Sequence, residues 1–93
     1  MIVNKKIVIK NKLGLHARPA AMFVQIANKF DCDISVKKGK QKVNGKSIMG
    51  IMMLAAGKGD TIHIRAEGQS ADVAISELDQ LLMGDLDKNE SVF

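Results

Sequence analysis

The sequence predicts an α+β domain of two layers, with helices on one side of a mainly antiparallel sheet. Segments in which apolar and polar residues alternate, typical of half-buried strands, are interleaved with segments whose apolar residues recur at helical spacing. Their order is strand, helix, strand, strand, helix, strand, helix. The chain has 93 residues, 46% of them hydrophobic and 26% charged, which fits one small globular domain over residues 1–93.

The first strand is expected over Ile2 to Lys10, where apolar and polar residues alternate, and Gly14 breaks the pattern. The spacing becomes helical at Ala17, and Pro19 suits the first turn of a helix, where its missing N–H has no partner to lose. This helix is expected to end at Asn28 or soon after it. Its buried face should consist of Ala20, Phe23, Val24 and Ala27.

Two strands and a short helix should follow. Asp33 to Lys37 alternates as a strand, and the residues KKGKQ predict a hairpin turn with Gly39 at its tip. A short strand over 41–44 completes the hairpin. Ser47 precedes an apolar run, which is typical of a helix N-cap, so a short helix is expected from Ile48.

The last strand and helix have the clearest patterns. Residues 61–67 alternate strictly, which predicts a strand with one face in water. Ser70 is expected to cap a final helix that stops at Gly84. The tail from Asp85 to Phe93 is polar, and we expect it to be frayed. The buried stripe of the final helix should consist of Ala71, Ala74, Leu78, Leu81 and Leu82.

Composition and charge narrow the classes of function. No run approaches the roughly 18 apolar residues of a membrane-spanning helix, and the first residues lack the apolar block of a signal peptide. The single cysteine, Cys32, has no partner for an internal disulfide, so the expected compartment is the cytoplasm. The net charge of +4 would suit nucleic acid, but the aromatic residues that single-strand binders use are missing. Solvated strand faces explain the charge best, followed by an anionic partner surface.

The segment GLHARPA, residues 14–20, is the first candidate site. Because Pro19 marks the helix start, His16 is expected at the helix N-terminus, beside the backbone N–H groups of Ala17 and Arg18. A helix N-terminus favours negative charge, and a neutral imidazole is a nucleophile. If the imidazole accepted a phosphoryl group, these N–H groups and the Arg18 side chain could hold its oxygens. The alternative is a histidine that only caps the helix beside a surface arginine.

The second candidate is Ser47 with the apolar run after it. The residues GKS at 45–47 suggest an ATP-binding phosphate loop, but position 40 is Lys instead of the required Gly, and the flanking strand is too short. A helix cap explains Ser47 without any function. The run crowds a helix of about two turns, so either some of its side chains are exposed for adaptable contacts with partners, or all fill the core. These residues are Ile48, Met49, Met52 and Met53.

The other chemistry-bearing residues predict no site. His63 is expected on the wet face of its strand, and Cys32 is isolated. No spacing of His, Cys, Asp or Glu suggests a metal site. We therefore expect neither a metal nor a cofactor.

GLHARPA followed by GKSIMGIMML resembles the histidine-containing phosphocarrier (HPr) family of the bacterial sugar phosphotransferase system, over roughly Ile2 to Met83. The resemblance implies an open-faced β-sandwich with strand order 1-4-2-3. It implies that His16 accepts a phosphoryl group on Nδ1 from Enzyme I, charged by phosphoenolpyruvate, and passes it to IIA domains of sugar permeases. Arg18 would help to hold the phosphate, and an HPr kinase/phosphorylase would modify Ser47. Partners would contact Ala20, Ile48, Met49 and Met52.

We therefore expect a monomeric cytoplasmic phosphocarrier that binds neither nucleic acid nor membrane. It would be a substrate and a phosphoryl donor of other proteins, not an enzyme. Three alternatives stay open. The motif around His16 also resembles the nitrogen-related branch, NPr, which serves regulation and not sugar uptake. A transcriptional regulator could bind the chain when Ser47 is phosphorylated, or a small basic domain could bind nucleic acid.

Overall fold

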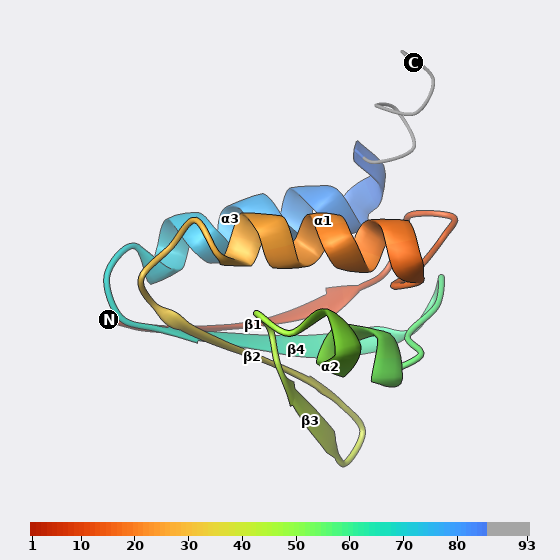
Figure 1. Cartoon of the computed structure of the whole chain (residues 1–93), viewed down its shortest axis with the longest axis horizontal. Helices are drawn as coiled ribbons and strands as arrows, with labels where there is room; N and C mark the ends of the chain where they lie inside the picture. Colours follow the sequence, from red (N-terminus) through yellow and green to blue (C-terminus); the bar gives the residue numbers. More distant parts are fainter. Residues whose placement is uncertain (86–93) are drawn as a thin grey trace.

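The structure of the chain is a computed structural model that describes residues 1–85 (Figure 1). The elements follow the order expected from the sequence. They are β1 (Ile2–Val8), α1 (Ala17–Ala27), β2 (Asp33–Lys38), β3 (Gln41–Asn44), α2 (Ile48–Met53), β4 (Thr61–Glu67), α3 (Ala71–Gln80) and a π-helical turn, η1 (Leu81–Asp85). Of the tail for which we expected fraying, all but Asp85 lies outside the described residues.

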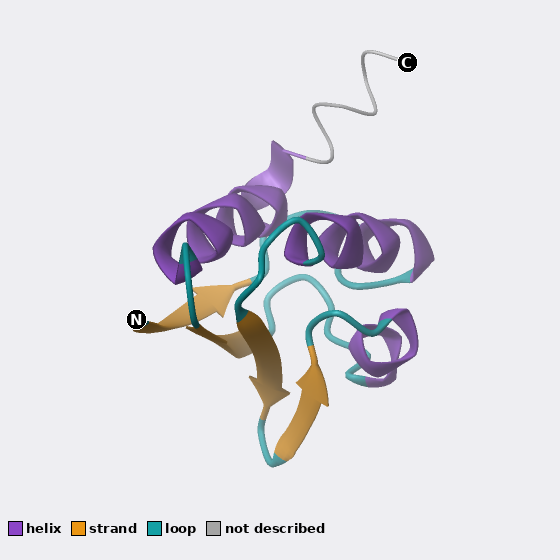
Figure 2. Cartoon of the chain, turned by 60° about the vertical axis from the view of Figure 1, so that its left-hand side comes forward, coloured by secondary structure: helices purple, strands orange, loops and turns teal. Residues whose placement is uncertain are grey.

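The four strands form one antiparallel sheet in the order β1-β4-β2-β3. Figures 1 and 2 show α1 and α3 side by side over one face of this sheet, while α2 packs against α1 and β3. Within residues 1–85, the opposite face of the sheet carries no helix. This arrangement confirms the α+β fold class and the strand order that the resemblance implied.

The core lies between the sheet and the helices. On β4, Ile62, Ile64 and Ala66 are fully buried, while His63 and Arg65 between them are exposed, as the strict alternation predicts. The predicted helix stripes are also buried, and Phe23 of α1 is the largest fully buried side chain among the described residues. Burying each such large apolar side chain contributes about 1.5–3 kcal/mol. The core therefore fixes the position on the sheet of α1, whose N-cap residue is His16.

Strand β1 is shorter than predicted. It ends at Val8, not Lys10, because the backbone N–H groups of the next two residues bond to carbonyls outside the sheet. The backbone N–H of Ile9 donates to Asp60 O at 2.9 Å, and that of Lys10 donates to Leu82 O at 2.9 Å. Alternation continues through Ile9, which is fully buried, so the pattern alone could not show where the sheet pairing stops.

Two expectations for the last helix need correction. Ser70 occupies the N-cap position of α3, but its side chain makes no capping hydrogen bond, because its backbone is left-handed (φ 62°). The α-helical part ends at Gln80, before the predicted stop. The chain winds on through η1 as far as Gly84, whose φ of 114° ends the helical path.

Candidate functional site

His16 is the N-cap residue of α1, and its imidazole is exposed. Its backbone is extended (φ −77°, ψ −168°), and its carbonyl accepts the N–H of Ala20 at 2.8 Å, which starts the helical hydrogen bonds. The side chain makes no capping hydrogen bond. The imidazole therefore does not cap the helix through a hydrogen bond.

The first turn of α1 provides an environment for an anion beside His16. An α-helix leaves the N–H groups of its first turn without intrahelical acceptors, and Ala17 and Arg18 begin this turn. No acidic residue lies in the turn to compete for those groups. Both residues are exposed, whereas Pro19 is buried and anchors the turn to the core. The site therefore combines an exposed ring nitrogen, a helix N-terminus and a guanidinium within three consecutive residues.

A close backbone contact holds the loop that carries His16. Leu15, which is 1% exposed, donates its N–H to Ala56 O at 2.8 Å. Gly14 adopts a φ of +58°, and a Cβ at this position would lie 2.7 Å from both Ala56 O and the Cα of Gly57. Only glycine fits here, since the conformation is left-handed and the neighbouring atoms are backbone. The loop between α2 and β4 thus packs directly against the loop that carries His16 and supports it.

Asn11 is a second support for this loop, and sequence analysis missed it. It is fully buried, its Nδ2 donates to Gly14 O at 3.0 Å, and its backbone N–H donates to Leu82 O at 3.2 Å. Its Oδ1 is buried with no hydrogen-bond partner within the described part of the chain. An asparagine three residues before a left-handed glycine is typical of a turn, which is the one signal the sequence offers. The signal does not reveal that the side chain is buried.

Lys38 and Asp60 stabilise the loop between α2 and β4 that supports the His16 loop. The Lys38 Nζ lies 3.3 Å from Leu54 O, Ala55 O and Asp60 Oδ2, so it binds two carbonyls that directly follow α2 and a carboxylate together. Asp60 Oδ2 also accepts the Gly57 N–H at 2.8 Å. This backbone hydrogen bond, followed by the Lys38 ammonium, holds the pKa of Asp60 below its ordinary value of 3.8. No local pattern predicts this pair, because Lys38 is the last residue of β2 and Asp60 lies in the loop before β4.

Ser47 caps α2 as predicted. Its Oγ accepts the Gly50 N–H at 3.1 Å, and its backbone is extended (φ −111°, ψ 117°). Ile51 is the one residue of α2 that is buried. The structure therefore decides between the two interpretations of the apolar run in favour of exposure. The exposed side chains, which we call the α2 patch, are Ile48, Met49, Met52 and Met53, with exposed fractions of 42%, 70%, 43% and 65%.

The remaining candidates, Ala20, His63 and Cys32, do not belong to the α2 patch. Ala20 is fully buried in the core, so the expectation that a partner contacts it is wrong. Its position one helical turn from His16 puts it on the inner face of α1. His63 is exposed on β4, and Cys32 is buried. Within residues 1–85 no group of His, Cys, Asp and Glu side chains is arranged to hold a metal ion, and no helix is long and apolar enough to cross a membrane.

One protein-family model matches nearly all of the described residues. The model described as the HPr component phosphorylation site of the phosphotransferase system (PTS) matches residues 3–83. A phosphocarrier protein HPr from Pseudomonas aeruginosa is 46% identical over 86 residues, covering 91% of this chain and 96% of the relative. A phosphocarrier protein NPr from Shewanella violacea is 36% identical over 86 residues, covering 92% and 94%.

Solved structures agree with the sequence matches. A crystal structure of a phosphocarrier protein HPr from Bacillus anthracis is 48% identical with a TM-score of 0.84, covering 87% of this chain and 96% of the other. A crystal structure of an HPr dimer from Thermoanaerobacter tengcongensis is 55% identical with a TM-score of 0.67, covering 81% and 86%.

Proposed function

The chain belongs to the HPr family of phosphocarrier proteins of the phosphotransferase system, and on that basis we propose that it carries a phosphoryl group on His16. The observation that supports this most directly is the His16 ring, which is exposed at the N-terminus of α1 and is not used as a cap. It would be a substrate of one protein and a donor to the next. We infer that it works in the cytoplasm, as one free buried cysteine suggests.

The proposed step is a direct transfer. The lone pair of Nδ1 on the neutral His16 ring attacks the phosphorus of the group carried by Enzyme I. A nitrogen–phosphorus bond forms as the bond between phosphorus and the donor atom breaks. The first-turn N–H groups and Arg18 then stabilise the charge on the phosphoryl oxygens. The next acceptor, a IIA domain of a sugar permease, removes the group by the same step in reverse.

The shape of the site fits a carrier that must release what it binds. The phosphoryl group would rest on a helix terminus and an exposed side chain, both open to water. Hydrogen bonds of this kind are individually worth about 0.5–3 kcal/mol, so they orient the group without trapping it. A partner can approach over the α2 patch, since α2 packs against α1.

Labelling tests this function. The protein is incubated with Enzyme I and labelled phosphoenolpyruvate, and the label on the protein is followed. We expect one acid-labile, base-stable label that is absent from His16→Ala and present in His63→Ala, the matched control. Label retained in His16→Ala, or lost in His63→Ala, would contradict the assignment.

We also propose that phosphorylation of Ser47 by an HPr kinase/phosphorylase controls docking. A phosphate here would lie at the N-terminus of α2, directly beside the α2 patch, and would add about −1.5 to −2 charges at pH 7. Covering the patch would then require stripping water from a phosphate, which disfavours the complex. A transcriptional regulator that binds the phosphorylated form would instead need cationic groups facing it.

Ser47→Asp mimics the charge and tests this regulation. We expect Enzyme I to load His16 much more slowly in Ser47→Asp, while Ser47→Ala loads at the parent rate. If Ser47→Asp loads normally and keeps its affinity for Enzyme I, Ser47 is only a helix cap.

The nitrogen-related branch is the second candidate, and the match to an NPr supports it. The two branches differ in the proteins that donate and accept the phosphoryl group. Competition between sugar-branch and nitrogen-branch donors for loading of His16 distinguishes them. Faster loading by the sugar-branch Enzyme I is the result we expect, and the reverse would assign the chain to NPr.

We propose that the carrier acts as a monomer, although one similar solved structure is described as a dimer. A carrier that meets several partners in turn needs the α2 patch and His16 uncovered. Sedimentation at working concentration tests this, and a dimer whose formation blocks loading of His16 would contradict it.

A further inference from the structure

We propose that the helix-free face of the sheet holds a second anion site, for a small chain of phosphates such as a polyphosphate. Pairing of the strands places one residue from each in a single row across the sheet. Lys6 of β1 lies opposite His63 of β4, His63 lies opposite Lys37 of β2, and Lys37 lies opposite Lys42 of β3. All four residues are exposed. With neighbouring strands about 4.8 Å apart, the row is about 14 Å long.

This row has no carboxylate to balance it. The structure of residues 1–85 shows no ion pair for Lys6, Lys37 or Lys42, although it pairs Lys5 with Asp79 at 2.6 Å. Lys37 and Lys42 are like charges directly opposite each other, an arrangement that destabilises a sheet. A polyanion bound beside Lys37 would offset this repulsion.

The shape of the face also singles out this row. Two shallow hollows lie on the open face. The one over the row has a volume of about 500 Å³, and Lys6, His63, Lys37 and the neighbouring Thr61 line it without any acidic group. A chain of phosphates seated here would receive ammonium groups, a hydroxyl and a ring N–H.

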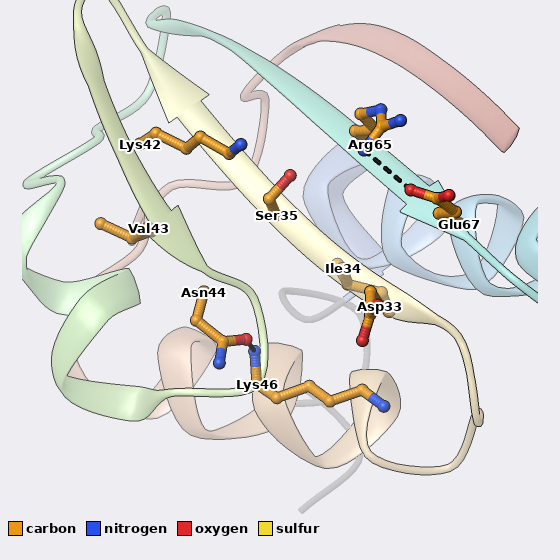
Figure 3. A pocket seen from close by; sticks show the side chains of 9 residues that line it. All are labelled: Asp33, Ile34, Ser35, Lys42, Val43, Asn44, Lys46, Arg65 and Glu67. Carbon is orange, nitrogen blue, oxygen red and sulfur yellow. Dashed lines mark hydrogen bonds and ion pairs between the residues drawn. The ribbon is translucent and has the colours of Figure 1, made fainter.

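The second hollow, of about 480 Å³, provides the contrast, because carboxylates line it. Arg65 lies 3.1 Å from Glu67 there, and Asp33 adds a further carboxylate (Figure 3). Figure 3 also shows Lys42 extending over β2 toward Ser35, so this lysine lines the second hollow while its backbone belongs to the row. Anions should therefore favour the hollow over Lys6 and Lys37.

The chemistry favours phosphates over a nucleic acid. Stacking of bases needs exposed aromatic rings, and within the described residues neither Phe23 nor Phe30 lines the two hollows of the open face. Recognition would rest on charge and hydrogen bonds alone, which suits a short polyphosphate. The site is separate from His16, because the helices lie on the other face of the sheet (Figure 1).

Titration of ¹⁵N-labelled protein with sodium tripolyphosphate, without divalent cations, tests the proposal. We expect saturable amide shifts around Lys6, Lys37 and His63, and the same shifts in His16→Ala. Lys6→Gln should weaken binding about three- to fivefold, the size of an exposed charge pair. Lys5→Gln is the matched control, since it removes the same charge from the opposite face of the same strand, and it should change binding less than twofold.

Three outcomes would overturn the proposal. Equal weakening by Lys5→Gln and Lys6→Gln would show that the anion senses only net charge. Shifts confined to Ala17 and Arg18 would place the anion at the N-terminus of α1. Binding to vesicles of phosphatidylglycerol that is lost in Lys6→Gln, with no saturable binding of tripolyphosphate, would make the row a membrane-binding surface instead.

Discussion

Replacing Ser47 by alanine tests the capping of α2 separately from its regulation. The mutation removes the Oγ that accepts the Gly50 N–H at 3.1 Å, and a partly buried N–H loses its partner. Loss of a serine N-cap costs about 1 kcal/mol, within a range of about 0.5–2 kcal/mol. For a domain of this size, 1 kcal/mol corresponds to a fall in Tm of about 4–8 °C. Urea unfolding gives the free energy directly, provided that the m-value does not change.

Ser70→Ala is the matched control, because Ser70 is also an N-cap residue but makes no side-chain capping hydrogen bond. We expect its free energy of unfolding to change by less than about 0.5 kcal/mol. Ser47→Asp keeps an acceptor and adds negative charge at a helix N-terminus, so it should equal or exceed the parent by about 0.3–1 kcal/mol. Equal losses in Ser47→Ala and Ser70→Ala would refute the reasoning, since only Ser47 makes a side-chain capping hydrogen bond.

Other predictions concern the loop around His16. Gly14→Ala should destabilise the fold by about 1–3 kcal/mol in urea unfolding, because its Cβ would lie 2.7 Å from Ala56 O at a φ of +58°; Gly39→Ala, at a similar φ with open space around it, should cost less, and equal costs would contradict the contact. Arg18→Ala should slow transfer to a IIA domain about ten- to a hundredfold while changing the unfolding free energy by less than about 1 kcal/mol; a strongly destabilised protein with normal transfer would argue against its role. Because the pKa of Asp60 is lowered in the folded state, its ionised form stabilises the fold above pH 3.8, and this stabilisation is lost as the pH falls through the folded pKa. The difference in Tm between the parent and Asp60→Asn should therefore shrink below pH 3.8. A difference that is constant down to pH 2 would show that the ionised Asp60 carboxylate does not stabilise the fold.

Much of the candidate site could be predicted because its signals are local. Pro19 and the change of hydrophobic period at Ala17 place His16 at a helix N-terminus, and the structure confirms this position. Ser47 before an apolar run is a local capping signal too, and its hydrogen bond to Gly50 confirms it. Ser70 has the same local signal and fails, because its backbone conformation depends on how the chain turns from β4 into α3.

The exposure of the α2 patch could not be predicted from its composition. A run of Ile and Met is compatible with the core or the surface, and the choice depends on how many sides of a short helix are covered. Here α2 packs against α1 and β3, which leaves Ile51 buried and the α2 patch exposed to water. Ala20 is the reverse case: the helical spacing predicted that it is buried, and the structure confirms this, whereas the resemblance implied a partner contact that a buried side chain cannot make.

The sequence by itself determined the periodicities, and through them the elements, their order and the two faces of each, because alternation and helical spacing arise from the geometry of a single segment. Only the tertiary structure decided which segments meet. It brought Gly14 against Gly57, buried Asn11 beneath the His16 loop and aligned Lys6, His63 and Lys37 in one row. These contacts join residues that are up to 57 positions apart, as Lys6 and His63 are, and the register that aligns them is set by packing of the whole core.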